Sequence, residues 1–562
     1  MIPFRVEWGS VNRNGLLFSS NFDIRFPLVL GFYCTSNVRR RESNHLRTFS
    51  ASSPTRVHGM KWVVVLLACM LSTAFLAPAS TGGERLTGTD SNSSRGTIRW
   101  HDCSAANRAA GVILTDFECG TLTVPLDWDN PDNPTNAHIK MAIHRTDPEE
   151  RIGALTFNPG GPGVSGLMAA GWQPGVLPSR VTTSFDYVAW DPRGVGLSQP
   201  QLTNCPNIVQ TYPVPTGPVD WHEYVSDRYR IVGTATSECL ANNVDVAPYL
   251  GTYYVIRDLE ALRLALGFRA WNFIGQSYGS RVGYWYARQF PERIRTLVLD
   301  ASYSPTQTVT SDMTQQASSY LTTQTVFSSL FGNRMGYRLQ RIFDAINDRE
   351  VVIGSVTFNR WELLDSLFSE VAYQFNYPTL LDQINSTYRA LFTGPKSKND
   401  SRLSTFQTRS SAKQVVPQDQ GLLNPVVNCR DLSDYPSIEE TTIAAQAAAR
   451  TSMYSALETV ISGANCAGFP SDYFHGFLPA TAALNLATGP VVISSLGDHI
   501  LNYNGARTMA NYLSDSALIT YNGTQHVTYS MVPSQCVNDP VTRYLISAQT
   551  PKSRFCKYVK YQ

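Results

Sequence analysis

The sequence has few charged residues and almost no net charge. Only 16% of its 562 residues are Asp, Glu, Lys or Arg, and the formal net charge is +2. Nucleic-acid-binding proteins and acidic interaction tails concentrate charge of one sign, so this composition argues against both classes. With 43% hydrophobic residues and no long polar tract after residue 100, the composition is that of a packed globular protein.

The sequence also lacks the spacings that bind metal ions or indicate repeats. It contains no Cys-x-x-Cys pair and no His-x-x-x-His helix, so a zinc site is not predicted. We find no internal repeat and no low-complexity array.

The early apolar run is too short to cross a membrane, since a spanning helix requires about 20 apolar residues. It covers residues 62–76, follows Met60 and Lys61, and precedes Ala-Pro-Ala at 77–79. This pattern predicts a secretory signal peptide at 60–79 and a secreted protein without a stable membrane span. An uncleaved signal anchor is the alternative. Residues 1–59 contain eight arginines and no lysine; a transit peptide is one interpretation, and we favour a start codon assigned too early.

Eight of the ten cysteines lie beyond these N-terminal segments, which contain Cys34 and Cys69. In an exported chain an even number predicts four disulfides, although eight cysteines allow 105 pairings. Local spacing favours pairs between sequence neighbours: Cys103 with Cys119, Cys205 with Cys239, Cys429 with Cys466, and Cys536 with Cys556. Sequons at Asn92, Asn385, Asn399 and Asn522 are candidate glycosylation sites.

From residue 120 onward, short apolar segments alternate with longer amphipathic segments. This order predicts an α/β protein with a mostly parallel, eight-stranded sheet and helices on both faces. The helical pattern is clear at 254–267, where Gly267 follows the last apolar position. The strand candidates are 120–126, 138–145, 153–160, 185–191, 270–277, 294–302, 489–498 and 517–523.

Two insertions interrupt the strand spacing. About sixty residues follow Asp191 and almost 190 follow Ala301 before the regular pattern resumes. The second insertion reads as helices, for example 361–375 and 437–462, with a polar loop at 394–413. We therefore expect a first half of the core at 80–302, a helical lid at 303–485 and a C-terminal part of the core at 486–562.

Gly275-Gln276-Ser277-Tyr278-Gly279 lies between a predicted strand and a predicted helix. A serine flanked by glycines at such a bend is typical of a nucleophile elbow, where a strained turn presents the hydroxyl. An ordinary turn is the alternative. A nucleophilic Ser277 requires a base, an acid that orients the base, and backbone donors for the oxyanion.

The candidate base is His526. Of nine histidines, only His499 and His526 follow the lid, and in this architecture the acid and then the histidine follow late strands. His499 adjoins Asp498 directly and is poorly placed to act with it. His526 lies just after the last predicted strand, where a catalytic histidine belongs.

Three aspartates follow predicted strands. Asp498 is our candidate for the orienting acid because it ends the strand that resumes the sheet after the lid. Asp300 is the alternative, since some enzymes of this architecture take the acid from that earlier strand. Asp191 is expected to be structural and paired with Arg193.

The oxyanion donors should be the backbone amide of Tyr278 and an amide of a glycine-rich loop after an earlier strand. The loop Asn-Pro-Gly-Gly-Pro-Gly at 158–163 follows such a strand and contains Gly160 and Gly161. Small residues allow the backbone to approach a substrate carbonyl closely.

Together these segments resemble secreted α/β-hydrolases of the proline iminopeptidase and tripeptidyl aminopeptidase group, peptidase family S33. The resemblance runs from about Cys103 to Cys556 without much of the lid, and the tail resembles the C-terminal domain named for tripeptidyl aminopeptidases. It implies that Ser277, Asp498 and His526 form the triad and that Gly161 and Tyr278 supply the oxyanion donors. The segments that carry it are 117–128, 158–166, 190–198, 257–267, 275–294, 497–506, 523–528 and 533–545.

The resemblance implies a secreted serine aminopeptidase of tripeptidyl or prolyl type, acting on peptides through an acyl-enzyme and requiring no cofactor. The chain departs from the family where Gln525 replaces the usual glycine before the histidine. A free amino terminus requires a carboxylate, and the lid offers Glu370, Asp431 and Glu439. The alternatives are a carboxylesterase or lipase acting on small esters, and a catalytically silent binding protein.

Overall fold

The structure, a computed structural model, describes residues 96–110, 114–206, 218–346, 351–353, 356–358, 370–392 and 421–561. The predicted signal peptide, the segment before it, the polar loop at 394–413, and Asn92 and Asn399 lie outside these ranges. Asn385 lies in helix α11 (Tyr377–Phe392), and its side-chain oxygen accepts a hydrogen bond from Arg338. Within the described ranges, no helix combines the length and apolar character that crossing a membrane requires.

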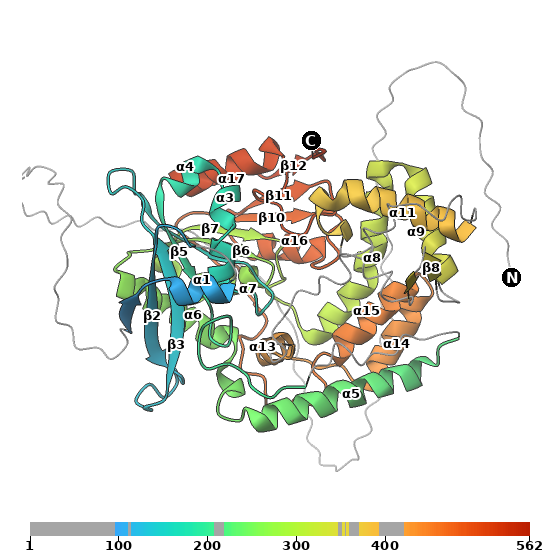
Figure 1. Cartoon of the computed structure of the whole chain (residues 1–562), viewed down its shortest axis with the longest axis horizontal. Coiled ribbons are helices and arrows are strands. Elements are labelled where there is room, and N and C mark those ends of the chain that lie inside the picture. The colour runs from blue at the N-terminus through green and yellow to red at the C-terminus, as the bar shows by residue number, and fades with distance from the viewer. Residues whose placement is uncertain are drawn as a thin grey trace, which may run out of the picture. The chain divides into compact units, whose positions relative to one another are not determined.

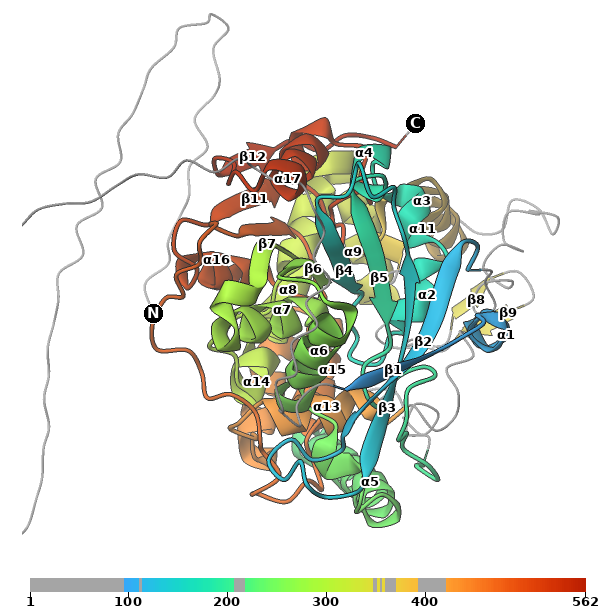
Figure 2. The same cartoon turned by 90° about the vertical axis from the view of Figure 1, so that its left-hand side faces the viewer.

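A ten-stranded sheet runs through the molecule in the order β1-β2-β3-β5-β4-β6-β7-β10-β11-β12 (Figure 1). Pairing is antiparallel from β1 to β5 and parallel from β5 to β12. Figure 2 shows β2, β3 and β5 beside one another. The strands are β1 (Thr97–His101), β2 (Phe117–Pro125), β3 (Asn136–His144), β4 (Gly153–Asn158), β5 (Phe185–Trp190), β6 (Trp271–Gln276), β7 (Ile294–Asp300), β10 (Val491–Ser495), β11 (Ala517–Tyr521) and β12 (Arg554–Cys556).

All eight predicted strands are present, and two further strands bring the sheet to ten. The additional strands, β1 and β12, form the two edges. Three of the five side chains of β1 are exposed and β12 has only three residues, so neither shows a hydrophobic period. Only pairing with a neighbouring strand defines them.

Alternate side chains of the central strands enter two separate hydrophobic clusters, one on each face of the sheet. Phe273 of β6 and Leu297 of β7 belong to the first cluster, with α6 (Thr252–Leu266), α7 (Tyr278–Gln289) and α16 (Tyr503–Asn511). Their neighbours Ile274 and Val298 belong to the second, with α2 (Gly166–Ala170), α4 (Ser179–Thr182) and α17 (Gln535–Ser547). Both faces are therefore covered by helices, as predicted.

Helices of the second insertion gather beyond one end of the sheet (Figure 1). Helix α5 (Trp221–Asn242), from the first insertion, joins them because Val225 packs with Ala445 and Val460. The predicted helix at 437–462 is two helices, interrupted at 450–452, where Ser452 caps the second. Within the described residues, the insertion contains the helices α8 (Val309–Phe331), α9 (Asn333–Ile346), α11, α13 (Leu423–Asp431), α14 (Ile438–Ala449) and α15 (Met453–Ala464).

Among the described residues, four disulfides join cysteines that follow one another in the sequence, in the pairs that local spacing favours. One of them, Cys429–Cys466, connects α13 to the segment directly after α15. The others are Cys103–Cys119, Cys205–Cys239 and Cys536–Cys556.

Candidate active site

Ser277 occupies a strained bend between β6 and α7. Its φ is 54° and its ψ is −123°, a backbone conformation that non-glycine residues rarely adopt. The bend also brings α7 close to β4, because a Cβ on Gly279 would lie 2.3 Å from the carbonyl oxygen of Asn158. This is the geometry of a nucleophile elbow, and Ser277 is 8% exposed at its apex.

The glycine-rich loop after β4 lies directly against this bend. A Cβ on Gly160, whose φ is +102°, would lie 2.6 Å from the carbonyl oxygen of Gln276 and 2.8 Å from Cβ of Ser277. Only glycine fits at such a contact without displacing backbone. The glycine-rich loop and Ser277 are therefore in direct contact.

Two backbone amides beside Ser277 remain available to a ligand. Gly160 donates its N–H to Oδ1 of Asn158 at 3.0 Å. By contrast, Gly161 and Tyr278 donate no backbone hydrogen bond to any described residue, and Tyr278 is the first residue of α7. Amides at a helix N-terminus are partly positive and suit an oxyanion. The geometry thus favours Gly161 over Gly160 as the loop donor.

Asp498 and His526 form a buried pair. His526 Nδ1 is 2.8 Å from Oδ2 of Asp498, and the two residues are 7% and 2% exposed. The other oxygen of Asp498 accepts from the amides of Ile500 and Leu501 at 3.0 and 3.1 Å. Because an ionised carboxylate only accepts hydrogen bonds, Nδ1 carries a proton, and Nε2 of the neutral ring is left as an acceptor.

Burial and the neighbouring carboxylates act in opposite directions on the pKa of His526. Burial alone lowers the pKa of this imidazole, but the charge and hydrogen bond of Asp498, with a smaller contribution from Asp300, outweigh burial and raise it above the ordinary value. His499 has the opposite balance, since burial lowers its pKa to about 4. His526 is therefore the histidine of the two that can take up a proton near neutral pH.

Asp300 joins the serine bend to the histidine loop. Its carbonyl oxygen accepts from the amide of Ser277 at 2.9 Å. Its Oδ2 accepts from the amides of Thr528 and Tyr529 at 2.8 and 2.6 Å. Ser277 and His526 therefore lie on loops fixed by the same residue, although Ser277 Oγ forms no hydrogen bond with any described residue. Asp300, the alternative candidate for the orienting acid, is therefore hydrogen-bonded to the backbone of the histidine loop and not to the His526 ring.

Gln525 also fixes the histidine loop, which the sequence did not indicate. Its Nε2 donates to the carbonyl oxygen of His526 at 2.8 Å, and its Oε1 accepts from the amide of Gln374 at 2.5 Å. The side chain that replaces the family glycine thus connects His526 to the insertion. The only signal in the sequence was that Gln525 stands where the resemblance predicts a glycine, and this signal did not indicate which groups its side chain contacts.

The predicted pairing of Asp191 with Arg193 is wrong. Arg193 donates to both carboxylate oxygens of Asp258, each at 2.7 Å. A guanidinium fork fits one carboxylate in this two-bond geometry. Asp191 instead accepts from Ser165 Oγ at 2.6 Å and from the amide of Leu197 at 2.8 Å. Its structural role is to hold the segments on either side of β5.

The three lid carboxylates have different surroundings. Glu439 is exposed in the first turn of α14. Asp431 is 5% exposed and accepts from both the amide and the hydroxyl of Thr252. Glu370 is half-buried and precedes Ala372, whose carbonyl oxygen accepts from the amide of His526 at 2.7 Å. Of the three, Glu370 belongs to the segment that contacts the histidine loop.

Comparison with known proteins finds a hydrolase family and several hydrolases. Residues 153–530 match the family described as alpha/beta hydrolase fold. The chain is 27% identical over 503 residues to serine protease Hip1 of Mycobacterium tuberculosis, covering 81% of this chain and 90% of that protein. It is 33% identical over 229 residues to tripeptidyl aminopeptidase of Streptomyces coelicolor, covering 38% and 39% of the two chains. Carboxylesterase B of M. tuberculosis is 28% identical over 214 residues, covering 37% and 40%.

Proposed function

The chain belongs to the α/β-hydrolase fold family and is a serine hydrolase, and on that premise we propose that it is an aminopeptidase of tripeptidyl or prolyl type. The observation that carries the catalytic part is the buried pair of His526 and Asp498 on a loop that Asp300 holds beside the strained Ser277. Similarity to a serine protease over most of the chain supports peptide substrates.

In this proposal Ser277 Oγ attacks the substrate carbonyl while His526 Nε2 takes the serine proton. Asp498 holds the imidazole tautomer and stabilises the imidazolium. The developing oxyanion accepts hydrogen bonds from the amides of Gly161 and Tyr278. His526 then protonates the leaving amine, and water activated by the same imidazole hydrolyses the acyl-enzyme. Asp300 and Gln525 keep the histidine loop in position but contact no reacting atom.

Glu370 is our candidate for recognition of the substrate amino terminus. A carboxylate held near the scissile carbonyl would pair with a free ammonium and fix how far the peptide extends past Ser277. Glu370 fits because its own segment, through Val371 and Ala372, accepts hydrogen bonds from the histidine loop. Asp431 contacts Thr252 and Arg281 rather than the histidine loop, and Glu439 is exposed on α14.

The substrate class is tested with free and N-blocked aminoacyl and tripeptidyl anilides beside short-chain nitrophenyl esters. Cleavage confined to the free amines supports the aminopeptidase. Turnover of the esters alone would overturn it in favour of a carboxylesterase, the activity named for one relative. Silence toward every substrate would indicate a binding protein. In each active case Ser277→Ala should lower kcat by about 10⁴- to 10⁶-fold.

The role of Glu370 is tested with a matched pair of lid variants. Glu370→Gln should raise KM for free-amine substrates by about 10- to 100-fold, because a hydrogen bond to a charged group contributes about 1.5–3 kcal/mol. Ester hydrolysis should change little. Glu439→Gln, at an exposed lid glutamate, should leave both activities unchanged. The assignment of Glu370 is contradicted if Glu370→Gln and Glu439→Gln change KM equally, or if Glu370→Gln affects peptide and ester hydrolysis equally.

The four disulfides are typical of a chain that folds in an oxidising compartment, which supports our further proposal that the protein is secreted. We also propose that the core comprises 80–302 and 486–562 and that 303–485 forms the lid. Mass spectrometry of the exported protein would test the first proposal through its N-terminus. An N-terminus before residue 60 in the mature protein would contradict signal cleavage at 79.

A further inference from the structure

Asp431 is a buried lid carboxylate that the proposed mechanism does not use. It ends helix α13, is 5% exposed, and is 3.4 Å from Nη1 of Arg281. The amide of Thr252 donates to its Oδ1 at 2.7 Å, and the hydroxyl of Thr252 donates to its Oδ2 at 2.6 Å. A buried charge is costly unless its oxygens are satisfied, and here both have donors.

The hydroxyl of Thr252 is shared with Tyr278. Thr252 Oγ1 lies 2.7 Å from the phenol oxygen of Tyr278, and all three side chains are buried. A threonine hydroxyl has one proton, and that proton goes to Asp431. Tyr278 must therefore donate to Thr252. The result is a directed chain of hydrogen bonds from Tyr278 through Thr252 to Asp431, which we call the Asp431 relay.

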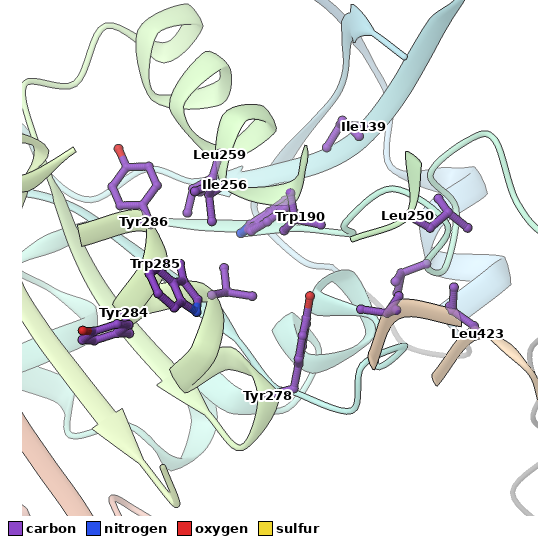
Figure 3. Close-up of a cluster of buried hydrophobic side chains, with 14 of the residues drawn as sticks. Ile139, Trp190, Leu250, Ile256, Leu259, Tyr278, Tyr284, Trp285, Tyr286 and Leu423 are labelled. Carbon is purple, nitrogen blue, oxygen red and sulfur yellow. The ribbon is translucent and has the colours of Figure 1, made fainter. Parts of the chain in front are cut away.

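The ring of Tyr278 is held along its whole length. At one end its backbone follows Ser277 and begins α7. Its ring lies in the hydrophobic cluster that includes Trp285 of α7 and Leu423 of α13 (Figure 3). At the other end its hydroxyl is bonded to Thr252, the first residue of α6. Rotation about the Tyr278 backbone would break this contact, so the relay limits the direction of the Tyr278 N–H.

Helix α13 is itself fixed to the core beside the relay. Asn428 Oδ1 accepts from Nη1 of Arg281 at 2.8 Å, and Arg281 lies one turn after Ser277 on α7. The carbonyl oxygen of Arg430 accepts from the amide of His475, and Cys429 is bonded to Cys466. Asp431 thus lies on a helix that is hydrogen-bonded to α7 and joined by a disulfide to the segment after α15.

We propose that Asp431 is a positioning residue that acts through Thr252 and Tyr278 to direct the Tyr278 amide at the oxyanion. The inference rests on the proposed function, because it assigns that amide as an oxyanion donor. It implies that the lid supplies part of the geometry of the oxyanion site as well as a wall of the substrate pocket. A misdirected donor weakens transition-state stabilisation and leaves ground-state binding nearly unchanged.

The experiment compares two tyrosines of the same helix. Tyr278→Phe removes the donor of the relay. Tyr286→Phe is the matched control, because Tyr286 is also buried in α7 and its hydroxyl donates 2.6 Å to Glu260 of the same helix α6. Loss of a complete oxyanion donor costs about 10²- to 10³-fold in kcat, so misdirection should cost about 10- to 100-fold. We expect this loss in Tyr278→Phe with KM within about twofold, and a near-normal kcat in Tyr286→Phe.

Thr252 provides an independent arm. Thr252→Val breaks the relay with little change of shape and should reproduce the kcat loss of Tyr278→Phe, while Thr252→Ser, which keeps the hydroxyl, should restore kcat. The double variant Thr252→Val with Tyr278→Phe should lose no more than the worse single variant, because both break one chain. Asp431→Ala should show the same split between kcat and KM. Active-site titration confines each kcat to folded protein.

A transition-state readout separates positioning from support of the fold. The tetrahedral adduct of a peptide boronic acid places an oxygen at the oxyanion site. Tyr278→Phe should therefore bind the boronic acid more weakly, in parallel with its loss of kcat, and should bind a product peptide with unchanged affinity. Equal kcat values in Tyr278→Phe, Thr252→Val and Tyr286→Phe would overturn the relay. Normal turnover by Ser277→Ala would instead overturn the proposed function, so the two failures are distinguishable.

Discussion

At the scale of the residue, two histidines near Asp498 show how a single contact changes the pKa of an imidazole. His499 directly follows Asp498 in the sequence, and burial lowers its pKa to about 4. His526 is 28 positions from Asp498 and bonded to it, and the pKa of His526 is raised. Since burial lowers the pKa of an imidazole, a carboxylate in the correct orientation makes the difference.

The first prediction concerns this carboxylate. Asp498→Asn should lower kcat/KM by about 10⁴-fold, because the amide no longer selects the productive tautomer or stabilises the imidazolium. A base must be neutral to act, so activity falls as the pH drops through the pKa of His526. Without the charge of Asp498, burial lowers that pKa, and the acid limb of the profile should move to lower pH. Measuring kcat/KM across pH tests this, and an unchanged limb contradicts it.

The second prediction concerns Asp300. Burial raises the pKa of this carboxyl to about 6. The folded protein therefore binds the proton more tightly than the unfolded chain, so the stabilising contribution exists at low pH and is lost as the pH rises through about 6. Asp300→Asn removes the titration but keeps an oxygen for the amides of Thr528 and Tyr529.

Between about pH 4 and pH 7, the wild type should lose about 1–3 kcal/mol of unfolding free energy relative to Asp300→Asn. Urea unfolding of both proteins at several pH values measures the difference. Parallel curves would show that Asp300 does not titrate in this range. Asp300→Ala should be less stable than Asp300→Asn at every pH, because it leaves two buried amides without an acceptor.

At the scale of the element, the site depends on how closely three backbone segments approach. The end of β4, the glycine-rich loop and the start of α7 meet at Gly160 and Gly279, where a side chain would overlap backbone atoms. The glycines in this motif are therefore required by contact between elements. Their pattern in the sequence predicts the turn, and the structure shows what each glycine makes room for.

The third prediction follows from this contact. Gly160→Ala would put a Cβ 2.6 Å from the carbonyl oxygen of Gln276, at a φ of +102°. The loop must move away, taking the Gly161 amide with it, and kcat should fall by about 10²- to 10³-fold. Gly175→Ala in α3 (Gln173–Val176) is the control, because nothing lies within 4 Å of its Cβ position. Equal kcat in the two variants would contradict the role of the loop.

At the scale of the whole molecule, the second insertion, which is our proposed lid, contacts the rest of the chain beside the candidate active site. Helix α13 contacts α6 through Asp431 and α7 through Asn428, and the segment from Val371 to Gln374 contacts the histidine loop. The insertion is therefore in direct contact with both halves of the site. A disturbance of the lid should affect turnover as well as substrate range.

The fourth prediction uses two disulfides. Replacing Cys429 and Cys466 by serine should cost about 4 kcal/mol from loop entropy, and replacing Cys103 and Cys119 about 3 kcal/mol. Of the two pairs, only Cys429 with Cys466 adjoins Asp431. We therefore expect only that variant to lose kcat, by about 10-fold or more, because Asp431 no longer directs the Tyr278 amide. Urea unfolding and active-site-titrated kcat measure the two effects. An equal loss of kcat in both variants would point to general loosening instead.

The eight apolar strands and the bend at Ser277 are predictable from the sequence, because burial in a parallel sheet and the glycines of the bend leave local patterns. The edge strands β1 and β12 have no such pattern in the sequence. The break between α14 and α15 is also not visible in the sequence, where the two helices form one long amphipathic segment. Periodicity records burial, and these features depend on pairing and capping.

The contacts that hold the catalytic candidates in place are visible only in the folded chain. Arg193 pairs with Asp258 rather than Asp191, Asp300 joins two loops, and Asp431 reaches Tyr278 through Thr252. Each partner is separated by dozens to hundreds of positions along the chain. Hydrogen bonds at that separation depend on distances of a few tenths of an ångström, which are set by packing and leave no spacing in the sequence.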